Sequence, residues 1–209
     1  MTVKLVKCVA LSALIALSAS CGDVSRQGRS PVQIVMRSLT AASGAEPSEM
    51  SGTLQSDVIV MVTDAPCSPE SPCPTIVNDI GEVAFSLIVK DPGSPGVAAS
   101  PSELNMVTIN RYRVEYKRTD GRNVQGVDVP YAFDSGLTMT IPNDGEVTAG
   151  FQIVRHTAKQ EAPLRALASN GTIISTIATV TFYGSDQAGN EITSTGNIGI
   201  DFGDFADPE

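Results

Sequence analysis

The chain has little of what most nucleic-acid-binding proteins and many enzymes depend on. It contains no tryptophan, one histidine, and 14 lysines and arginines against 23 aspartates and glutamates. Phosphate backbones repel a chain with a formal charge of -9, and no basic patch with interleaved aromatic residues offsets that charge. We therefore expect no nucleic-acid partner. Beyond the N-terminus, no apolar run is long enough to span a bilayer.

Catalytic motifs are also missing. The single histidine, His156, follows Arg155 at the end of an expected strand, where an exposed strand-end residue is the simplest interpretation. No serine occupies a nucleophile elbow, and no phosphate-binding glycine loop or paired-histidine motif occurs. Two carboxylates at a suitable separation could hydrolyse a glycosidic bond, but the sequence does not show such a separation. We predict a protein that is not an enzyme and has no cofactor.

The first twenty residues have the organisation of a secretory signal. Lys4 and Lys7 precede the apolar run Val9–Leu17, and small residues follow it. The apolar run is shorter than the ~20 residues of a membrane-spanning helix, so residues 1–20 are predicted to be a signal peptide that export removes. Their removal changes the formal charge from -9 to -11, because two lysines and no acidic residue are lost.

The residues Leu17-Ser18-Ala19-Ser20-Cys21 resemble the lipobox of bacterial lipoproteins. The resemblance implies that Cys21 receives a diacylglyceryl group and, after cleavage, an N-acyl chain. Ser18 departs from the pattern, because an aliphatic residue usually stands there. Gly22 rather than aspartate follows the cysteine, which by the same resemblance implies the outer membrane. Ser18 and Ser20 also suit an ordinary signal peptidase, so simple secretion is the alternative.

Cysteine counting predicts one disulfide. Cys8 leaves with the signal peptide, and lipidation of Cys21 leaves Cys67 and Cys73 as a pair in an oxidising compartment. A bridge across residues 68–72 closes a small ring and stabilises the fold by no more than about 2 to 3 kcal/mol. A zinc site is the alternative, although zinc normally takes four ligands and the chain offers one histidine.

A polar segment, residues 22–30, follows the lipidation site and is predicted to be a tether. Ten residues, counted from Cys21, reach about 33 to 36 Å when extended and average roughly 17 Å as a flexible coil, so the folded part stays close to the membrane. Arg26 and Arg29 could rest on anionic headgroups, or the segment could simply be a solvated linker.

From residue 31 onwards, apolar and polar residues alternate with a period of two, which predicts strands. These segments are 32–36, 54–63, 82–90, 107–117, 127–134, 137–141, 147–153, 174–182 and 192–202. The alternation changes phase near Asn110, which predicts a β-bulge there or a strand that passes between the sheets. Pro130 has no amide hydrogen for a ladder bond, which predicts that the strand 127–134 lies at a sheet edge or a bulge. Helical period is nearly absent, and Pro163 interrupts the one candidate, Ala158–Leu167.

About nine or ten short strands, with no helix long enough for a parallel crossover, predict an all-β fold, an antiparallel sandwich. Ala178–Asn190 resembles the terminal hairpin of bacterial immunoglobulin-like modules, and Tyr112–Tyr116 is similar to a central strand of fibronectin type III domains. The resemblance implies an immunoglobulin-like β-sandwich over residues 31–209, without the core tryptophan of antibody domains. One domain is favoured over two, because Asp91–Pro101 reads as a long loop rather than a linker.

Acidic turns make calcium the best-motivated metal hypothesis. Asp186 and Asn190 share one turn, while Asp201, Asp204 and Asp207 lie near the C-terminus. These side chains offer the oxygen ligands that calcium prefers. Aspartate and asparagine also fill turns for backbone reasons, and no EF-hand loop is present, so the prediction remains that no metal is bound.

Taken together, these features predict a lipid-anchored, non-enzymatic protein of the bacterial cell envelope. Its sandwich would serve as a structural or binding module, with a protein or glycan partner held by its loops, an expectation that rests on fold analogy. The alternative is a cell-surface hydrolase or its carbohydrate-binding accessory domain. Close carboxylates in an aromatic-lined cleft would favour the hydrolase, whereas an exposed strand edge or an apolar loop patch would favour binding.

Overall fold

A computed structural model describes residues 28–205 of the chain. The predicted signal peptide, Cys21 and all of the tether before Gly28 lie outside the described residues, as does Asp207. The predictions of lipidation and export therefore stay predictions. None of the described helices is long and apolar enough to cross a membrane.

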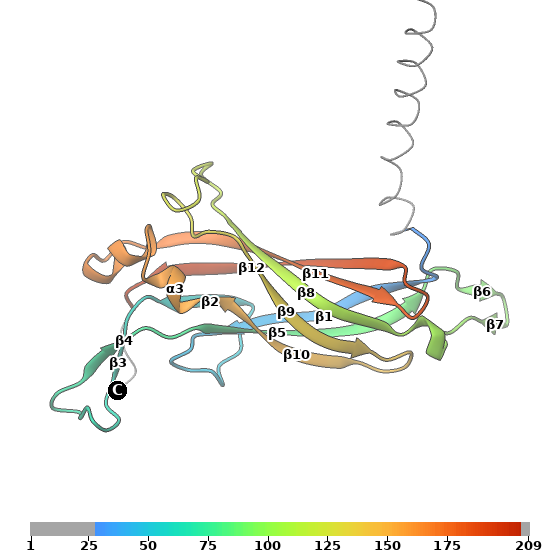
Figure 1. Cartoon of the computed structure of the whole chain (residues 1–209), viewed down its shortest axis with the longest axis horizontal. Coiled ribbons are helices and arrows are strands. Elements are labelled where there is room, and N and C mark those ends of the chain that lie inside the picture. Colours follow the sequence, from blue (N-terminus) through green and yellow to red (C-terminus); the bar gives the residue numbers. More distant parts are fainter. Residues whose placement is uncertain (1–27, 206–209) are drawn as a thin grey trace, which may run out of the picture.

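Two β-sheets pack face to face and form the body of the molecule (Figure 1). The smaller sheet has the order β1-β5-β10 and consists of Val32–Ala42, Asp79–Val89 and Val147–Val154. The larger sheet has the order β2-β12-β11-β8-β9 and consists of Thr53–Asp57, Glu191–Gly203, Ile174–Asp186, Val107–Lys117 and Phe133–Ile141. The all-β sandwich is confirmed. One pairing departs from a purely antiparallel arrangement, because β2 runs parallel to β12.

Short strands and helices lie outside the two main sheets. Two small ribbons are formed by the pairs β3 with β4 and β6 with β7, with bounds Val60–Val62, Cys73–Thr75, Gly93–Ser94 and Val97–Ala98. The helical pieces are η2 (Glu103–Asn105), α3 (His156–Lys159) and η3 (Leu164–Ser169). The described residues thus hold 12 strands rather than nine or ten, because the sequence pattern did not reveal three-residue and two-residue ribbons.

The core lies between the sheets and contains a cluster of aromatic rings. Phe85 and Phe151 come from the smaller sheet and meet Tyr112 and Phe182 of the larger sheet, with ring centroids 5.1 to 6.1 Å apart, mostly edge to face. The hydroxyl of Tyr112 also donates a hydrogen bond of 3.0 Å across the sandwich to the Gln152 carbonyl. The rings therefore fix the two sheets against each other.

The predicted change of phase in β8 is confirmed. In the pairing of β8 with β11, Arg111 and Ile109 face the adjacent residues Tyr183 and Gly184, which leaves Asn110 as the extra residue. Ile109 and Tyr112 both remain buried as a result.

One predicted strand is wrong. Residues 127–132 form part of a loop, and β9 begins only at Phe133. Of the alternating residues Val127, Val129 and Tyr131, only Val129 is buried. Pro130 has no amide hydrogen for a ladder bond, and local hydrogen bonds of the loop replace the pairing with a neighbouring strand.

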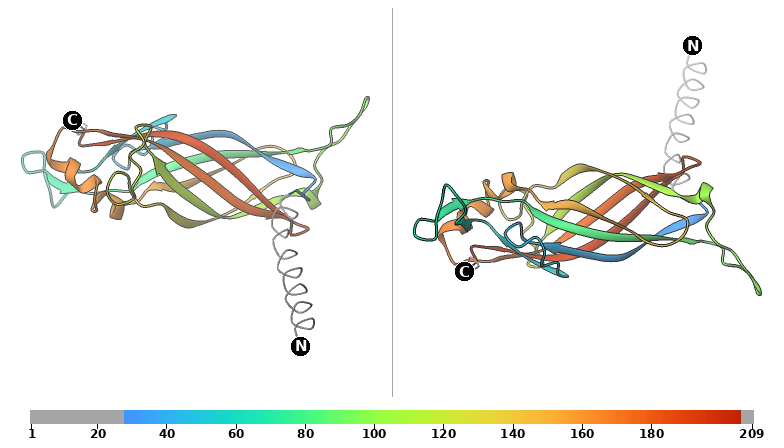
Figure 2. Two further views of the ribbon diagram at one scale, coloured as in Figure 1. Left: turned by 90° about the horizontal axis from the view of Figure 1, so that it is seen from above. Right: turned by 90° about the horizontal axis from the view of Figure 1, so that it is seen from below.

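The strands give the sandwich two distinct ends (Figure 2). The proximal end holds the start of β1, the β6–β7 ribbon, and the turns that join β9 to β10 and β11 to β12. The distal end holds the β3–β4 ribbon, α3, η3, the β8–β9 loop and the end of β12. Ser30, predicted to belong to the tether, is buried at the proximal end, where its hydroxyl accepts a hydrogen bond from the Val32 amide.

Candidate binding surface at the distal end

The loop between β8 and β9, at the distal end, carries a cluster of exposed apolar side chains. This segment, residues 118–132, is called the distal loop below, and it projects away from the larger sheet (Figure 1). Val124, Val127 and Tyr131 are 61%, 65% and 51% exposed. A packed protein rarely leaves three such side chains of one loop in water, so the loop is a candidate contact surface.

The distal loop is held by its own hydrogen bonds. The Val124 amide donates to Asp128 Oδ2 at 3.0 Å, the Gly126 amide donates to the Val129 carbonyl at 2.8 Å, and the Ala132 amide donates to Gln125 Oε1 at 3.1 Å. These bonds satisfy polar backbone groups within the loop. Contact with a partner would therefore cost little additional ordering of the backbone.

The backbone conformation and the neighbouring Tyr131 ring require a glycine at position 126. Its φ of +76° lies in the left-handed region, and a Cβ at this position would come within 2.5 Å of the Tyr131 ring carbon Cζ. The Tyr131 ring therefore lies against the backbone of Gly126. This contact orients an exposed aromatic side chain, which is typical of anchor residues at protein interfaces.

Charged residues flank the apolar cluster at the start of the loop. Asp120 accepts hydrogen bonds from the guanidinium groups of Arg118 and Arg122, at distances of 2.6 and 2.9 Å for their Nη2 atoms. The backbone amide of Arg122 and these two guanidinium groups hold the pKa of Asp120 at about 2. The start of the loop thus carries a fixed charged cluster beside the three apolar side chains.

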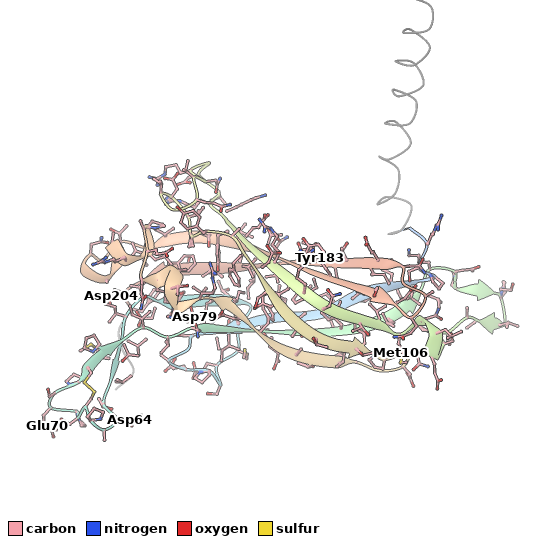
Figure 3. The ribbon with its side chains drawn as sticks, in the orientation of Figure 1. Asp64, Glu70, Asp79, Met106, Tyr183 and Asp204 are labelled. Carbon is pink, nitrogen blue, oxygen red and sulfur yellow. A yellow bond between two sulfur atoms is a disulfide. The ribbon has the colours of Figure 1, made fainter. Side chains whose placement is uncertain are left out.

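A buried ion pair lies beneath the distal end. Lys159 Nζ of α3 donates to Asp79 Oδ1 of β5 at 2.8 Å, and neither side chain is accessible to solvent. Ser56 Oγ donates to the other carboxylate oxygen at 2.6 Å, and the Gly44 amide donates to Oδ1 at 3.0 Å. One carboxylate therefore connects four separate segments of the chain. Figure 3 shows Asp79 near this end of the sandwich.

Burial dominates the electrostatics of this group. It raises the pKa of Asp79, and the charge of Lys159 and the hydrogen bonds from Lys159, Ser56 and Gly44 only partly oppose the rise. Neither side chain of the pair reaches solvent, although Asp79 also belongs to the lining of the adjacent groove. We assign the pair a structural role in positioning the distal segments.

A groove of about 680 Å³ opens beside this network. Asn78, Phe151 and His156 belong to its lining. His156 begins α3 and is exposed, as predicted, and its ring Nδ1 lies 3.0 Å from Asn78 Oδ1. No group of three or more histidine, cysteine, aspartate or glutamate side chains within residues 28–205 is arranged to hold a metal ion.

The structure separates the calcium candidates. Asp186 and Asn190 share the β11–β12 turn at the proximal end, whereas Asp201 lies near the far end of β12. Asp204 follows that strand at the distal end (Figure 3). The oxygens of Asp186 already have partners, since Oδ1 accepts from the Ala188 and Asn190 amides and Oδ2 accepts from Asn190 Nδ2. The Ser30 side chain also hydrogen-bonds this carboxylate. These bonds help to lower the pKa of Asp186 against the opposing effect of burial.

The predicted disulfide is confirmed. Cys67 and Cys73 are bridged, with Cα atoms 5.7 Å apart, in the segment that forms the β3–β4 ribbon. Asp64 and Glu70 mark the outer part of this segment in Figure 3, which extends from the distal end away from the distal loop.

The two main features of the distal end were not predicted from the sequence. The alternation rule assigned Val127 and Tyr131 to a strand, although Gly126 and Pro130 in the same run were signals of a loop. The partnership of Lys159 with Asp79 left no local signal, because the two residues lie 80 positions apart in the chain. Comparison with protein-family models and with curated proteins found no match for this chain.

Proposed function

We propose that the protein is a lipid-anchored component of the bacterial cell envelope, non-enzymatic, whose sandwich presents the distal loop to a protein partner. Cys21 would carry the lipid and hold the proximal end near a membrane, which by the lipobox resemblance is the outer membrane. The observation that carries the binding proposal is the exposed cluster of Val124, Val127 and Tyr131 on an ordered loop at the other end of the molecule.

The chemistry of this cluster favours a protein over a glycan. Two of its three side chains are branched aliphatic groups, which bury area well in a protein interface but cannot stack on a sugar ring. Tyr131 supplies an amphipathic anchor, and Arg118, Asp120 and Arg122 supply a polar rim. An apolar centre with a charged rim is the usual arrangement of a protein interface.

Site-specific photo-crosslinking in intact envelopes tests this proposal. A photoreactive residue at Val127 should give a discrete crosslinked species of higher mass, whereas the same residue at the exposed position Thr193 of β12 should give none. No crosslink at Val127 under conditions in which the protein is folded and membrane-bound would contradict the proposal.

Gly126→Ala provides a second variant for the same experiment. The added Cβ would displace Tyr131 and strain a left-handed backbone position at a cost of roughly 1 to 2 kcal/mol. The crosslink at Val127 should therefore weaken. Gly121→Ala is the matched control, because Gly121 has a φ of +82° in the same loop but open space around it. It should leave the crosslink largely unchanged.

A further inference from the structure

We infer that the β6–β7 ribbon at the proximal end rests on the lipid surface to which the chain is anchored. This inference rests on the proposed lipid anchor and adds a second point of membrane contact. It is carried by the position of the ribbon, by its exposed apolar side chains and by its lack of charge.

The ribbon lies where a membrane contact is geometrically available. It projects beyond the ends of the strands at the same end of the sandwich as the start of β1 (Figures 1 and 2). Six residues lie between Cys21 and Gly28, the first described residue, so the two ends of this segment are at most about 25 Å apart. A lipid on Cys21 would therefore keep the proximal end, rather than the distal loop, next to the bilayer.

Apolar side chains at this end face solvent. Val97 of the ribbon is 73% exposed, and Leu104 of the neighbouring η2 is 76% exposed. Residues 92–102 contain no charged side chain and three prolines. A small, uncharged and apolar tip can enter the headgroup region without the cost of burying a charge.

The backbone of the ribbon already has a defined conformation. Gly93 and Ser94 pair with Ala98 and Val97, and the Ala99 amide donates to the Pro92 carbonyl at 3.0 Å. Gly96 follows Pro95 with a φ of +88°, which is typical of a type II turn. The tip therefore presents Val97 without a further ordering step.

The charges around the ribbon oppose contact between the rest of the proximal end and an anionic membrane. Exposed acidic residues outnumber Arg29, Arg37 and Lys90 there; they are Asp91, Glu103, Asp144, Glu146 and Glu191. Anionic headgroups would repel these side chains within about 10 Å at 0.1 M salt. The protruding ribbon is thus the part of this end that can reach lipid while the acidic rim stays in water.

Environment-sensitive fluorescence on the full lipidated protein tests the inference. Val97→Cys and, as a matched control, Val127→Cys would each be labelled with a polarity-sensitive dye and reconstituted into phosphatidylethanolamine vesicles. Val127 is 65% exposed and lies at the opposite end. Labelling without reductant leaves the Cys67–Cys73 bridge intact.

The dye at position 97 should emit at a shorter wavelength and be protected from an aqueous quencher. The dye at position 127 should emit as it does in water and remain accessible to the quencher. Added phosphatidylglycerol should reduce the shift at Val97, because the acidic rim is repelled. Equal, water-like signals at both positions in protein that floats with the vesicles would overturn the inference and leave the anchor intact. Failure to float would overturn the anchor and the inference with it.

The same samples distinguish lipid contact from two other causes of a dye shift at Val97. A shift at Val97 that grows with protein density in the vesicles would mean contact between copies of the chain and would overturn the lipid assignment. A shift that appears in detergent-free protein without vesicles would do the same. A shift that depends on vesicles and not on protein density supports it.

Discussion

Asp79 and Lys159 place opposite charges in the least accessible part of the molecule. Removing two charges from water is costly, and their attraction offsets the cost only when the remaining polar atoms also find partners. Ser56 and Gly44 provide such partners for the carboxylate. Because the four residues come from four segments, we expect the pair to fix one arrangement of the distal end rather than to add much net stability.

Lys159→Met should therefore destabilise the fold strongly. The substitution leaves the Asp79 carboxylate buried without its charged partner, a change that typically costs about 3 to 5 kcal/mol. The measurement is the free energy of unfolding from denaturant titration at neutral pH. A loss below about 1 kcal/mol would show that the pair contributes little to holding the distal segments.

The pH dependence of this variant gives an independent check. Burial raises the folded-state pKa of Asp79, and losing Lys159 removes an opposing influence, so the pKa rises further. Between the unfolded and folded pKa values the folded state binds more protons, so stability falls as pH increases. Lys159→Met should thus lose more stability between acidic and neutral pH than the parent. The double variant with Asp79→Asn should lack this added slope.

Calcium should leave the melting temperature unchanged. The candidate ligands Asp186 and Asn190 bond to each other, and Asp201 and Asp204 lie at the other end of β12. A ligand stabilises a protein only when it binds the folded state preferentially. Thermal melts of the delipidated protein with millimolar calcium and with a chelator provide the measurement, and a clear rise with calcium would reveal a site.

At the scale of elements, alternation predicted the strands that build the core. The pattern succeeded for β11 and β12, because each has one face against the other sheet and one face toward solvent. It also located the bulge at Asn110, because a change of phase is visible in the sequence.

Alternation failed in the distal loop for a physical reason. A run such as Val127, Val129 and Tyr131 has the period of a strand, but a strand also needs a neighbour with free backbone groups. Local hydrogen bonds, including that from Gly126 to Val129, satisfied the backbone instead. The sequence contained the turn-forming residues, but tertiary structure decides whether this backbone pairs with a neighbouring strand or bonds within a loop.

Removal of the disulfide should leave the sandwich folded. The bridge closes a ring over a separation of 6 residues, and β3 and β4 form a two-stranded sheet outside the two main sheets. Replacing Cys67 and Cys73 together with serine should therefore cost no more than about 2 to 3 kcal/mol. Denaturant titration would measure the loss, with mass spectrometry of the non-reduced parent to verify the link. A double variant that cannot fold would contradict this estimate.

At the scale of the whole molecule, the two ends have different surfaces. The proximal end combines an acidic rim with the uncharged β6–β7 ribbon, and the distal end combines the distal loop with the disulfide-bridged ribbon. This polarity is consistent with a protein held at one end and exposed at the other.

Cys21→Ser should release the protein from the membrane without unfolding it. The substitution removes the proposed acylation site, and a chain without acyl groups has no strong membrane affinity of its own. Lipid labelling should be lost, and the variant should either stall in processing or fractionate as soluble protein with the parent's melting temperature. Parent protein that is soluble and carries no acyl mass at its mature N-terminus would replace the lipoprotein hypothesis with simple secretion.

The antiparallel pairing of β1 with β5 has a mechanical consequence. The partners run from Val32 with Val89 at the proximal end to Ala42 with Ile80 at the distal end, so the ladder extends along nearly the whole body. A pull between a membrane at the proximal end and a partner on the distal loop would act along the strands, across hydrogen bonds that lie perpendicular to them. The ladder would then be loaded in shear, with its bonds sharing the force, and would resist detachment far better than a ladder opened one bond at a time.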